Sequence, residues 1–170
     1  MPPRFRRLAT PHGDFVVTLD GDRLLRTGWV ALGERPPAEA REDPRLAPRL
    51  AAAIRAALAG EPVDFRDEAI PGAPPFTLAC RRAAQAIPAG STVRYAGLAS
   101  LAGRPAAARA AGQAMRRNPV PIVVPCHRVI GSLGPGGFAG ATRKDCLALA
   151  VKLDLLARES GNRGRLARSP

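Results

Sequence analysis

Hydrophobic and polar residues alternate near the N-terminus of this 170-residue chain. Phe15, Val17 and Leu19 lie on one face of an extended segment, and a second apolar run leads to Trp29. Gly and Asp residues separate these runs, which is typical of turns between strands. The pattern predicts a small β-meander over residues 4–31. His12 falls in one of its turns, with no Cys, His or acidic cluster at ligand spacing, and is expected to be a loop residue.

The apolar spacing then changes to that of a helix. Leu46, Leu50, Ile54 and Leu58 recur every four residues, and Gly60 follows as a stop signal. Asp43 is expected to be the N-cap, with Pro44 at the first helical position. Residues 32–43 read as a loop, and residues 63–70 as one more edge strand or extended segment. Residues 1–70 carry no evident chemistry and are predicted to be a scaffold domain.

A Pro- and Gly-rich stretch, residues 71–75, predicts a linker. Helical spacing returns over residues 76–86, with Cys80 on the apolar face and expected in the core. Two further helices, over 95–102 and 106–117, flank a tight Gly-containing turn, which is the helix-turn-helix pattern. The fold class predicted is therefore α+β: a small antiparallel sheet-plus-helix domain, followed by a mostly helical helix-turn-helix (winged-helix-like) domain over 76–158.

The end of the chain combines a loop, a helix and a basic tail. Residues 131–140 are dense in glycine and predict a loop able to close over a pocket, without a phosphate-loop pattern. A last helix is predicted over 143–156, with an inward face made of Cys146, Leu147, Leu149, Ala150 and Leu153. Residues 159–170 read as a basic, disordered tail.

The second helix of the helix-turn-helix is built almost wholly from small residues and arginine. A slim helix of this kind can approach a nucleic-acid groove closely, while its arginines meet phosphates or a gap between bases. The alternative is an alanine-rich helix packed on a neighbour, with the arginines as a solvated face. This segment alone does not separate the two interpretations.

Cys126 and His127 stand side by side at the end of a β-branched run. A thiolate is a strong nucleophile, and a neighbouring imidazole can take its proton or lower its pKa. The alternative is a buried cysteine that only packs beside a strand end. Asn118 ends the preceding helix because Pro119 follows it. Seven residues then lead to Cys126, and they are predicted to form one extended strand that couples the slim helix to the cysteine.

The composition shows a positive net charge and indicates the cellular compartment. Lys and Arg outnumber Asp and Glu by 26 to 14, giving a net charge of +12, which favours a polyanionic partner. An arginine-rich bias with no partner is the alternative. Three widely spaced cysteines argue against a disulfide framework or a cysteine zinc site. With no signal peptide or membrane-spanning run, the chain is expected in the cytoplasm.

Three segments together resemble O(6)-alkylguanine-DNA alkyltransferases, which repair alkylated guanine by moving the alkyl group onto their own cysteine. The first is Ile-Pro-Ala-Gly at 87–90 with Val-Arg-Tyr at 93–95. The second runs from Gly-Arg-Pro at 103–105 to Asn-Pro-Val-Pro-Ile at 118–122. The third is Val-Pro-Cys-His-Arg-Val-Ile at 124–130. The resemblance covers about residues 76–157, whereas the N-terminal half fits the family loosely.

The resemblance implies roles for individual residues. Cys126 is the alkyl acceptor, His127 its base acting through a water, and Asn118 the hinge. Tyr95 presses on the target phosphate and lines the pocket, and Arg109 fills the gap left by an extruded base. The positions implied to lie in the minor groove are Ala107, Ala108, Gly112, Met115 and Arg116. Those implied to line the substrate pocket are Pro121, Val129, Phe138 and Ala139.

Two departures from the family pattern stand out. The family places on its last helix a glutamate that hydrogen-bonds the histidine, and its expected place falls here at Val151. Asp154, one turn later, is hypothesised to substitute for it. The pocket loop is about a residue short, with Phe138 where a tyrosine is usual, so the accepted alkyl groups are open.

The function expected is single-turnover repair of O(6)-alkylguanine, with O(4)-alkylthymine as a further substrate, in double-stranded DNA by a monomer that needs no cofactor or metal. One alternative is an alkyltransferase-like protein that binds lesions without transfer; such proteins generally lack the cysteine. A Cys-His peptidase is the other, but no acyl-binding groove or oxyanion donor set is evident.

Overall fold

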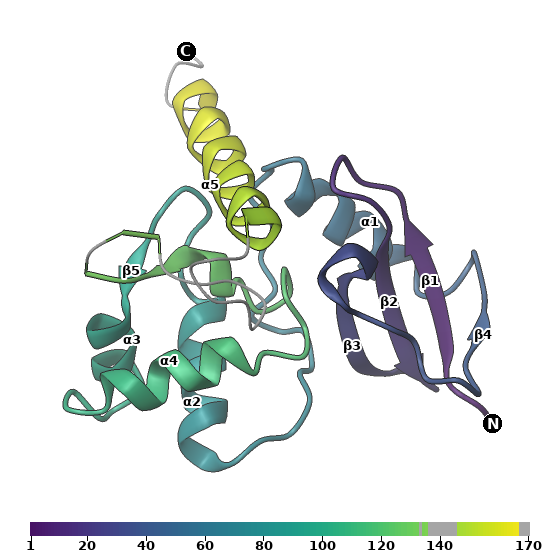
Figure 1. Ribbon diagram of the computed structural model, residues 1–170, viewed down its shortest axis with the longest axis horizontal. Helices are drawn as coiled ribbons and strands as arrows, with labels where there is room; N and C mark the ends of the chain where they lie inside the picture. Colours follow the sequence, from purple (N-terminus) through teal and green to yellow (C-terminus); the bar gives the residue numbers. More distant parts are fainter. Residues whose placement is uncertain (133, 136–145, 167–170) are drawn as a thin grey trace.

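The computed structural model describes residues 1–132, 134, 135 and 146–166. A four-stranded sheet with one helix forms the N-terminal half, and a group of helices forms the C-terminal half (Figure 1). The last helix, α5, rises beside both halves. This is the α+β architecture that the sequence predicts. Among the described residues no helix is long and apolar enough to cross a membrane.

The N-terminal sheet confirms the predicted meander. Strands β1 (Arg4–Leu8), β2 (Phe15–Asp20) and β3 (Arg23–Trp29) pair antiparallel in sequence order. A short strand, β4 (Arg41–Glu42), adds to β1 in parallel, so the sheet order is β3-β2-β1-β4. Strand β4 has two charged residues and no hydrophobic alternation, which is why its pattern predicted a loop.

Helix α1 (Pro48–Leu58) starts four residues later than predicted. Asp43 does act as a local cap, but of a turn, through Asp43 Oδ1 accepting from the Arg45 amide at 2.9 Å. Pro48 takes the first helical position instead of Pro44. Both prolines fit the preference for proline at the start of a helix, so the sequence alone did not distinguish them. Residues 63–70 form no strand, contrary to one of the two forms expected.

The C-terminal half contains the predicted helix-turn-helix. Helix α2 (Pro75–Gln85) packs against α3 (Tyr95–Leu101) and α4 (Ala108–Arg116), and a tight turn joins the last two. Two short strands, β5 (Val93–Arg94) and β6 (Val129–Ile130), pair in parallel. This pairing places the start of α3 beside the end of the Cys-His segment.

The two halves share one contiguous hydrophobic cluster, which includes the fully buried Cys80 as predicted. Thr27 in β3 also joins them by hydrogen bonds. Its amide donates to Pro119 O at 2.9 Å, and its hydroxyl donates to Pro121 O at 2.7 Å. The segment from Asn118 to Val129, called the reactive loop from here on, is therefore fastened to the N-terminal sheet. The division into domains at residues 71–75 stays a prediction.

Helix α5 (Cys146–Leu166) corrects two predictions. It continues through the segment predicted to be a disordered tail, at least to Leu166. Its buried side is made of Ala148, Val151, Lys152, Leu155 and Glu159, whereas Leu147 and Leu153, predicted inward, are 40% and 48% exposed. Two charged residues complete this buried stripe, so a search for apolar spacing selects the wrong side and stops too early.

Candidate active site around Cys126

The segment between Asn118 and Cys126 is a compact buried loop and not the predicted extended strand. The Asn118 side chain spans it, because Nδ2 donates to Val124 O at 2.9 Å and Oδ1 accepts from the Val120 amide at 3.1 Å. Ile122 has a φ of 77°, a left-handed conformation that costs a β-branched residue energy. The asparagine thus joins the end of α4 to the residues just before the cysteine.

Cys126 opens a short 3₁₀ helix, η2 (Cys126–Arg128), and only 6% of it is exposed. Burial raises the pKa of its thiol, because a charged sulfur loses hydration there. The Asn118 side chain, the positive charge of Lys152 and the backbone amides of Cys126 and His127 act in the opposite direction without cancelling burial. The resting thiol is therefore protonated at neutral pH and needs a base to become a nucleophile.

Glu159 is the acid that orients His127. Its Oε1 lies 2.8 Å from His127 Nε2, and both side chains are 2% exposed. Arg128 binds the same carboxylate through Nε and Nη2, and its Nη1 donates to Ile87 O at 2.7 Å. The Gly90 amide donates to Oε2 at 3.1 Å. A single buried carboxylate therefore fixes both residues that follow the cysteine.

His127 and Glu159 do not form an ordinary ion pair. Burial would raise the pKa of Glu159, but hydrogen bonds from His127 and Arg128 outweigh it and lower that pKa to about 2. Burial also lowers the pKa of His127, despite the opposing effect of Glu159. We infer a neutral imidazole that donates its Nε2–H to a charged carboxylate. Nδ1 is then the basic atom, and it is buried without a hydrogen-bond partner in the described part of the chain.

Asp154 was hypothesised to orient His127, and the structure contradicts this. Its Oδ2 lies 2.8 Å from Nε2 of His12, the histidine expected to be only a loop residue. Arg158 donates to the same oxygen at 2.8 Å. Asp154 thus faces the N-terminal half. The error came from ending the last helix at residue 156, since Glu159 lies one turn beyond Leu155 on the buried stripe.

Lys152 is a second residue that sequence reasoning missed. It is fully buried, and its Nζ donates to Val129 O at 2.7 Å. Burial lowers its pKa to about 8, while the nearby Cys126 sulfur opposes that change. The available signal was a lysine between the apolar residues Ala148, Val151 and Leu155 of α5. Its charge is placed to stabilise the thiolate form of Cys126.

Tyr95 lies close to the cysteine at the start of α3. Burial raises the pKa of its phenol, and the Cys126 charge raises it further. The Tyr95 ring also packs on α4, since a Cβ added at Gly112 would lie 3.8 Å from the ring. The predicted pocket residues Pro121 and Val129 are buried in the loop and in β6. Phe138 and Ala139 lie outside the described residues.

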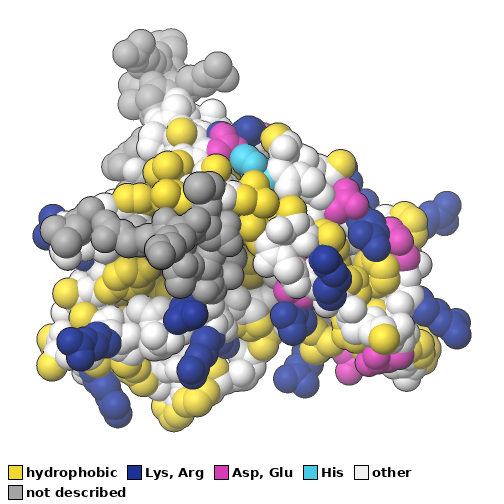
Figure 2. Space-filling view, in the orientation of Figure 1, with side chains coloured by type: hydrophobic (Ala, Val, Ile, Leu, Met, Phe, Trp, Pro, Cys, Tyr) yellow, Lys and Arg dark blue, Asp and Glu magenta, His cyan; other side chains and the backbone are white. Residues whose placement is uncertain are grey.

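Helix α4 presents a narrow charged side. Arg109 and Arg116 are exposed, Ala108 is half-buried, and Ala107 is the residue just before the helix. Met115 was predicted among the groove contacts, but it is 3% exposed and packs in the core, because it lies on the side of α4 that faces the other helices. Lys and Arg side chains also mark the outer surface of both halves (Figure 2).

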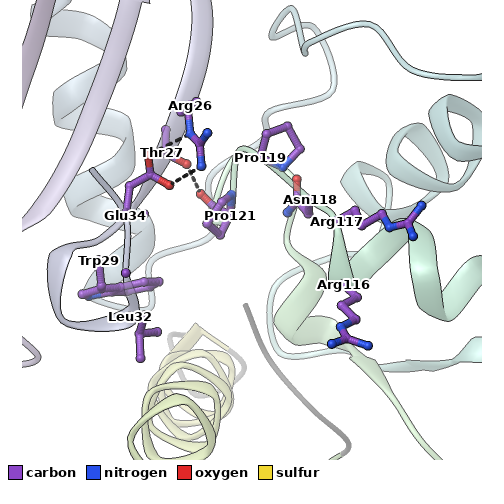
Figure 3. A pocket seen from close by; sticks show the side chains of 12 residues that line it. Arg26, Thr27, Trp29, Leu32, Glu34, Arg116, Arg117, Asn118, Pro119 and Pro121 are labelled. Carbon is purple, nitrogen blue, oxygen red and sulfur yellow. Dashed lines mark hydrogen bonds and ion pairs between the residues drawn. The ribbon is translucent and has the colours of Figure 1, made fainter. Parts of the chain in front are cut away.

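A cavity of about 380 Å³ separates β3 from the end of α4. Figure 3 shows Arg26 paired with Glu34 on one wall and Asn118 and Pro119 on the other. The Arg26–Glu34 contacts are 2.8 and 3.1 Å. In the described ranges, no three His, Cys, Asp or Glu side chains gather as metal ligands.

Residues 75–161 match the model of one protein family, described as "6-O-methylguanine DNA methyltransferase, DNA binding domain". It is 36% identical over 139 residues to the constitutive methylated-DNA–protein-cysteine methyltransferase of Bacillus subtilis, covering 78% of this chain and 84% of that protein. The Mycolicibacterium paratuberculosis protein of the same name is 40% identical, with coverage of 75% and 71%. The human protein of that name is 51% identical over 77 residues, which is only 34% of its length.

The fold also matches a solved structure along nearly its whole length. That structure is Mycobacterium tuberculosis OGT in complex with DNA, with a TM-score of 0.74, 28% identity and 93% coverage of both chains. The family-model match spans the reactive loop and α4, and the structural match extends into the N-terminal half. The chain belongs to the 6-O-methylguanine DNA methyltransferase family.

Proposed function

We propose that this chain repairs alkylated DNA by moving the alkyl group from O(6) of guanine onto Sγ of Cys126. The enzyme class, methylated-DNA–protein-cysteine methyltransferase, follows from the family and its curated members. The observation that carries the residue assignment is the buried thiol held between Asn118, Lys152 and the Glu159-oriented His127. This arrangement suits one nucleophile and one base, and it needs no cofactor.

In the proposed reaction, His127 Nδ1 takes the proton of the thiol through a bridging water. The thiolate then attacks the alkyl carbon, a carbon–sulfur bond forms, and the carbon–oxygen bond to guanine breaks. The electron pair of that bond leaves on guanine, which takes up a proton. Thiol and alkylguanine thus become thioether and guanine. A thioether is a stable product, so each chain reacts once.

DNA would enter along the exposed side of α4. A helix with few large side chains fits a minor groove, Arg116 meets phosphate, and Arg109 fills the gap left by a flipped base. Flipping costs a few kcal/mol and least for a damaged pair, which favours lesions without base-edge contacts. O(4)-alkylthymine carries its alkyl group on a comparable oxygen and is proposed as a further substrate. The wild-type chain would bind as a monomer.

Mass spectrometry of the chain after incubation with an O(6)-methylguanine duplex tests the proposal. We expect one added methylene on the peptide that contains Cys126, no addition in Cys126→Ser, and full addition in Cys80→Ser, the matched buried cysteine. Tight lesion binding with an unmodified Cys126 would support the alternative of a lesion-binding protein. Addition on Cys80 or Cys146 instead would refute the assignment of the acceptor.

The DNA-binding side is tested separately by the salt dependence of binding. Replacing one phosphate-contacting arginine, in Arg116→Ala, should lower the slope of log K against log salt by about 1. Arg109→Ala should reduce transfer from duplex DNA more than it reduces binding, because it acts after the base is flipped. An exposed arginine on the sheet, Arg23, provides the control substitution to Ala. Equal losses in all three variants would contradict a role for α4.

A further inference from the structure

Helix α5 contacts both halves of the protein with different sets of side chains. One set, Lys152 and Glu159, reaches the reactive loop. The other set, Asp154, Arg158 and Asn162, is spaced by four residues and forms a stripe toward the N-terminal half. Residues four apart lie on one side of a helix. We call these three residues the docking stripe.

Three contacts hold the docking stripe. Asp154 Oδ2 lies 2.8 Å from His12 Nε2, in the turn after β1. Asn162 Nδ2 donates to Ala59 O at 3.4 Å, at the end of α1. Between them, Gly60 lies so close to α5 that an added Cβ would come within 2.6 Å of the Arg158 carbonyl carbon. Figure 1 shows α5 next to α1.

These contacts set the rotation and depth of α5. An α-helix moves as a nearly rigid rod over a few turns, so fixing one part of it also fixes the position of its neighbouring turns. Asp154 is two residues from Lys152 and five from Glu159. A rotation of α5 about its axis that separates Asp154 from His12 would also move the Lys152 ammonium relative to the Cys126 sulfur. It moves the Glu159 carboxylate relative to His127 as well.

We propose that His12 and Asp154 are positioning residues for alkyl transfer, which hold α5 where Lys152 and Glu159 activate the thiol. This inference rests on the proposed function. Neither residue touches the reacting atoms. The simpler role is that of a partly exposed pair that only adds stability, since the two side chains are 21% and 32% exposed. The two roles differ in what their loss changes: the rate of transfer at saturating DNA, or only the free energy of unfolding.

The experiment measures single-turnover transfer from an O(6)-methylguanine duplex across pH, together with affinity for unmodified duplex. His12→Ala and Asp154→Ala should slow transfer at saturating DNA by about five- to tenfold, with affinity unchanged because α4 is untouched. The midpoint of the pH–rate profile should move upward, since Lys152 then stabilises the thiolate less. A loss of stability alone would not move that midpoint in folded protein.

Conservative variants and a control complete the test. His12→Gln keeps an N–H donor and Asp154→Asn keeps an acceptor, so both should recover most of the rate. Gly60→Ala should reproduce the loss by displacing Arg158 without removing any polar group. Ser160→Ala, an exposed substitution on the same helix, should react as wild type. All variants are assayed as full chains, below the temperature at which circular dichroism shows unfolding.

The outcomes separate this inference from the proposed function. If His12→Ala, Asp154→Ala and Gly60→Ala all transfer at the wild-type rate with an unshifted pH midpoint, the positioning role is wrong and the proposed function stands. If His12→Gln and Asp154→Asn are as slow as the alanine variants, the hydrogen bond is not the active feature and the inference is also overturned. If the wild-type chain transfers nothing, the proposed function itself fails.

Discussion

Helix α5 takes part in two clusters, each of which combines a histidine, a carboxylate and an arginine. His127, Glu159 and Arg128 meet beneath the reactive loop, and His12, Asp154 and Arg158 meet on the docking stripe. The histidine–carboxylate distance is 2.8 Å in both. The difference is burial: the first pair is 2% exposed on each side, and the second is 21% and 32% exposed.

Burial changes what the same contacts do. Water can replace a lost partner in the exposed cluster, so each bond there contributes little to stability. In the buried cluster a carboxylate without partners would be stranded in a medium of low polarity, and its loss leaves Arg128 and His127 unsatisfied. The buried cluster can therefore hold one histidine tautomer, whereas the exposed cluster can only help to hold a helix in place. Four predictions follow from this contrast.

The largest effect is expected from Glu159→Gln. Removing the charge from a buried, paired carboxylate should lower the free energy of unfolding by about 3–5 kcal/mol. Transfer should fall by about a hundredfold or more, because His127 loses the acceptor that fixes its tautomer. Asp154→Asn is the matched control on the exposed cluster and should cost under about 1 kcal/mol. Denaturant unfolding and single-turnover kinetics measure both, and equal costs in the two variants would remove the contrast.

Acid should unfold the protein through the buried cluster. The pKa of Glu159 is lowered from 4.5 to about 2 in the folded chain, so its contribution is complete above pH 4.5 and is lost between pH 4.5 and 2. At ~1.4 kcal/mol per pKa unit this is about 3 kcal/mol. The pKa of His127 is also lowered by burial, so its contribution is lost in the same direction, starting below pH 6.5.

Urea titrations at a series of pH values measure that acid limb. The limb should be markedly shallower in Glu159→Gln, which has no carboxylate left to protonate at this site. It should be unchanged in Asp154→Asn apart from a small offset. An acid limb of wild-type steepness in Glu159→Gln would place the pH dependence elsewhere in the molecule.

A smaller effect is expected from Lys152→Met. The substitution keeps a long side chain but removes the charge that lowers the thiol pKa, so transfer near pH 7 should slow by about tenfold. The midpoint of the pH–rate profile should rise. Stability should change less than in Glu159→Gln, since a buried ammonium is itself costly to desolvate. A profile identical to wild type would show that Lys152 has only a structural role.

The smallest effect is expected from Arg158→Gln. Its contact with Asp154 is an i, i+4 pair, and the Arg158 side chain is 36% exposed. Such pairs contribute about 0.3–0.5 kcal/mol. Transfer should stay within about twofold of wild type, because Asp154 keeps its bond to His12. Thermal melts and the transfer assay measure the change, and a larger loss of rate would make Arg158 part of the positioning contact.

Much of the fold was predictable because hydrophobic spacing is strong where strands and helices bury one side. The meander and the helix-turn-helix were readable in this way. The buried side of helix α5 and its extension beyond residue 156 were not, because Lys152 and Glu159 occupy buried positions that hydrophobic spacing treats as exposed. The loop was misread for a different reason: Val123 and Val124 favour a strand, but Asn118 bonds both ends of the segment and forces a turn.

The contact between Thr27 and the reactive loop has a consequence for solubility. Strand β3 lies at one edge of the sheet, and an unpaired edge is a template for aggregation. At that edge the Thr27 amide and hydroxyl donate hydrogen bonds to Pro119 O and Pro121 O. Neither proline has an amide hydrogen with which to continue a ladder. The loop that presents the cysteine therefore also blocks the β3 edge of the sheet at Thr27.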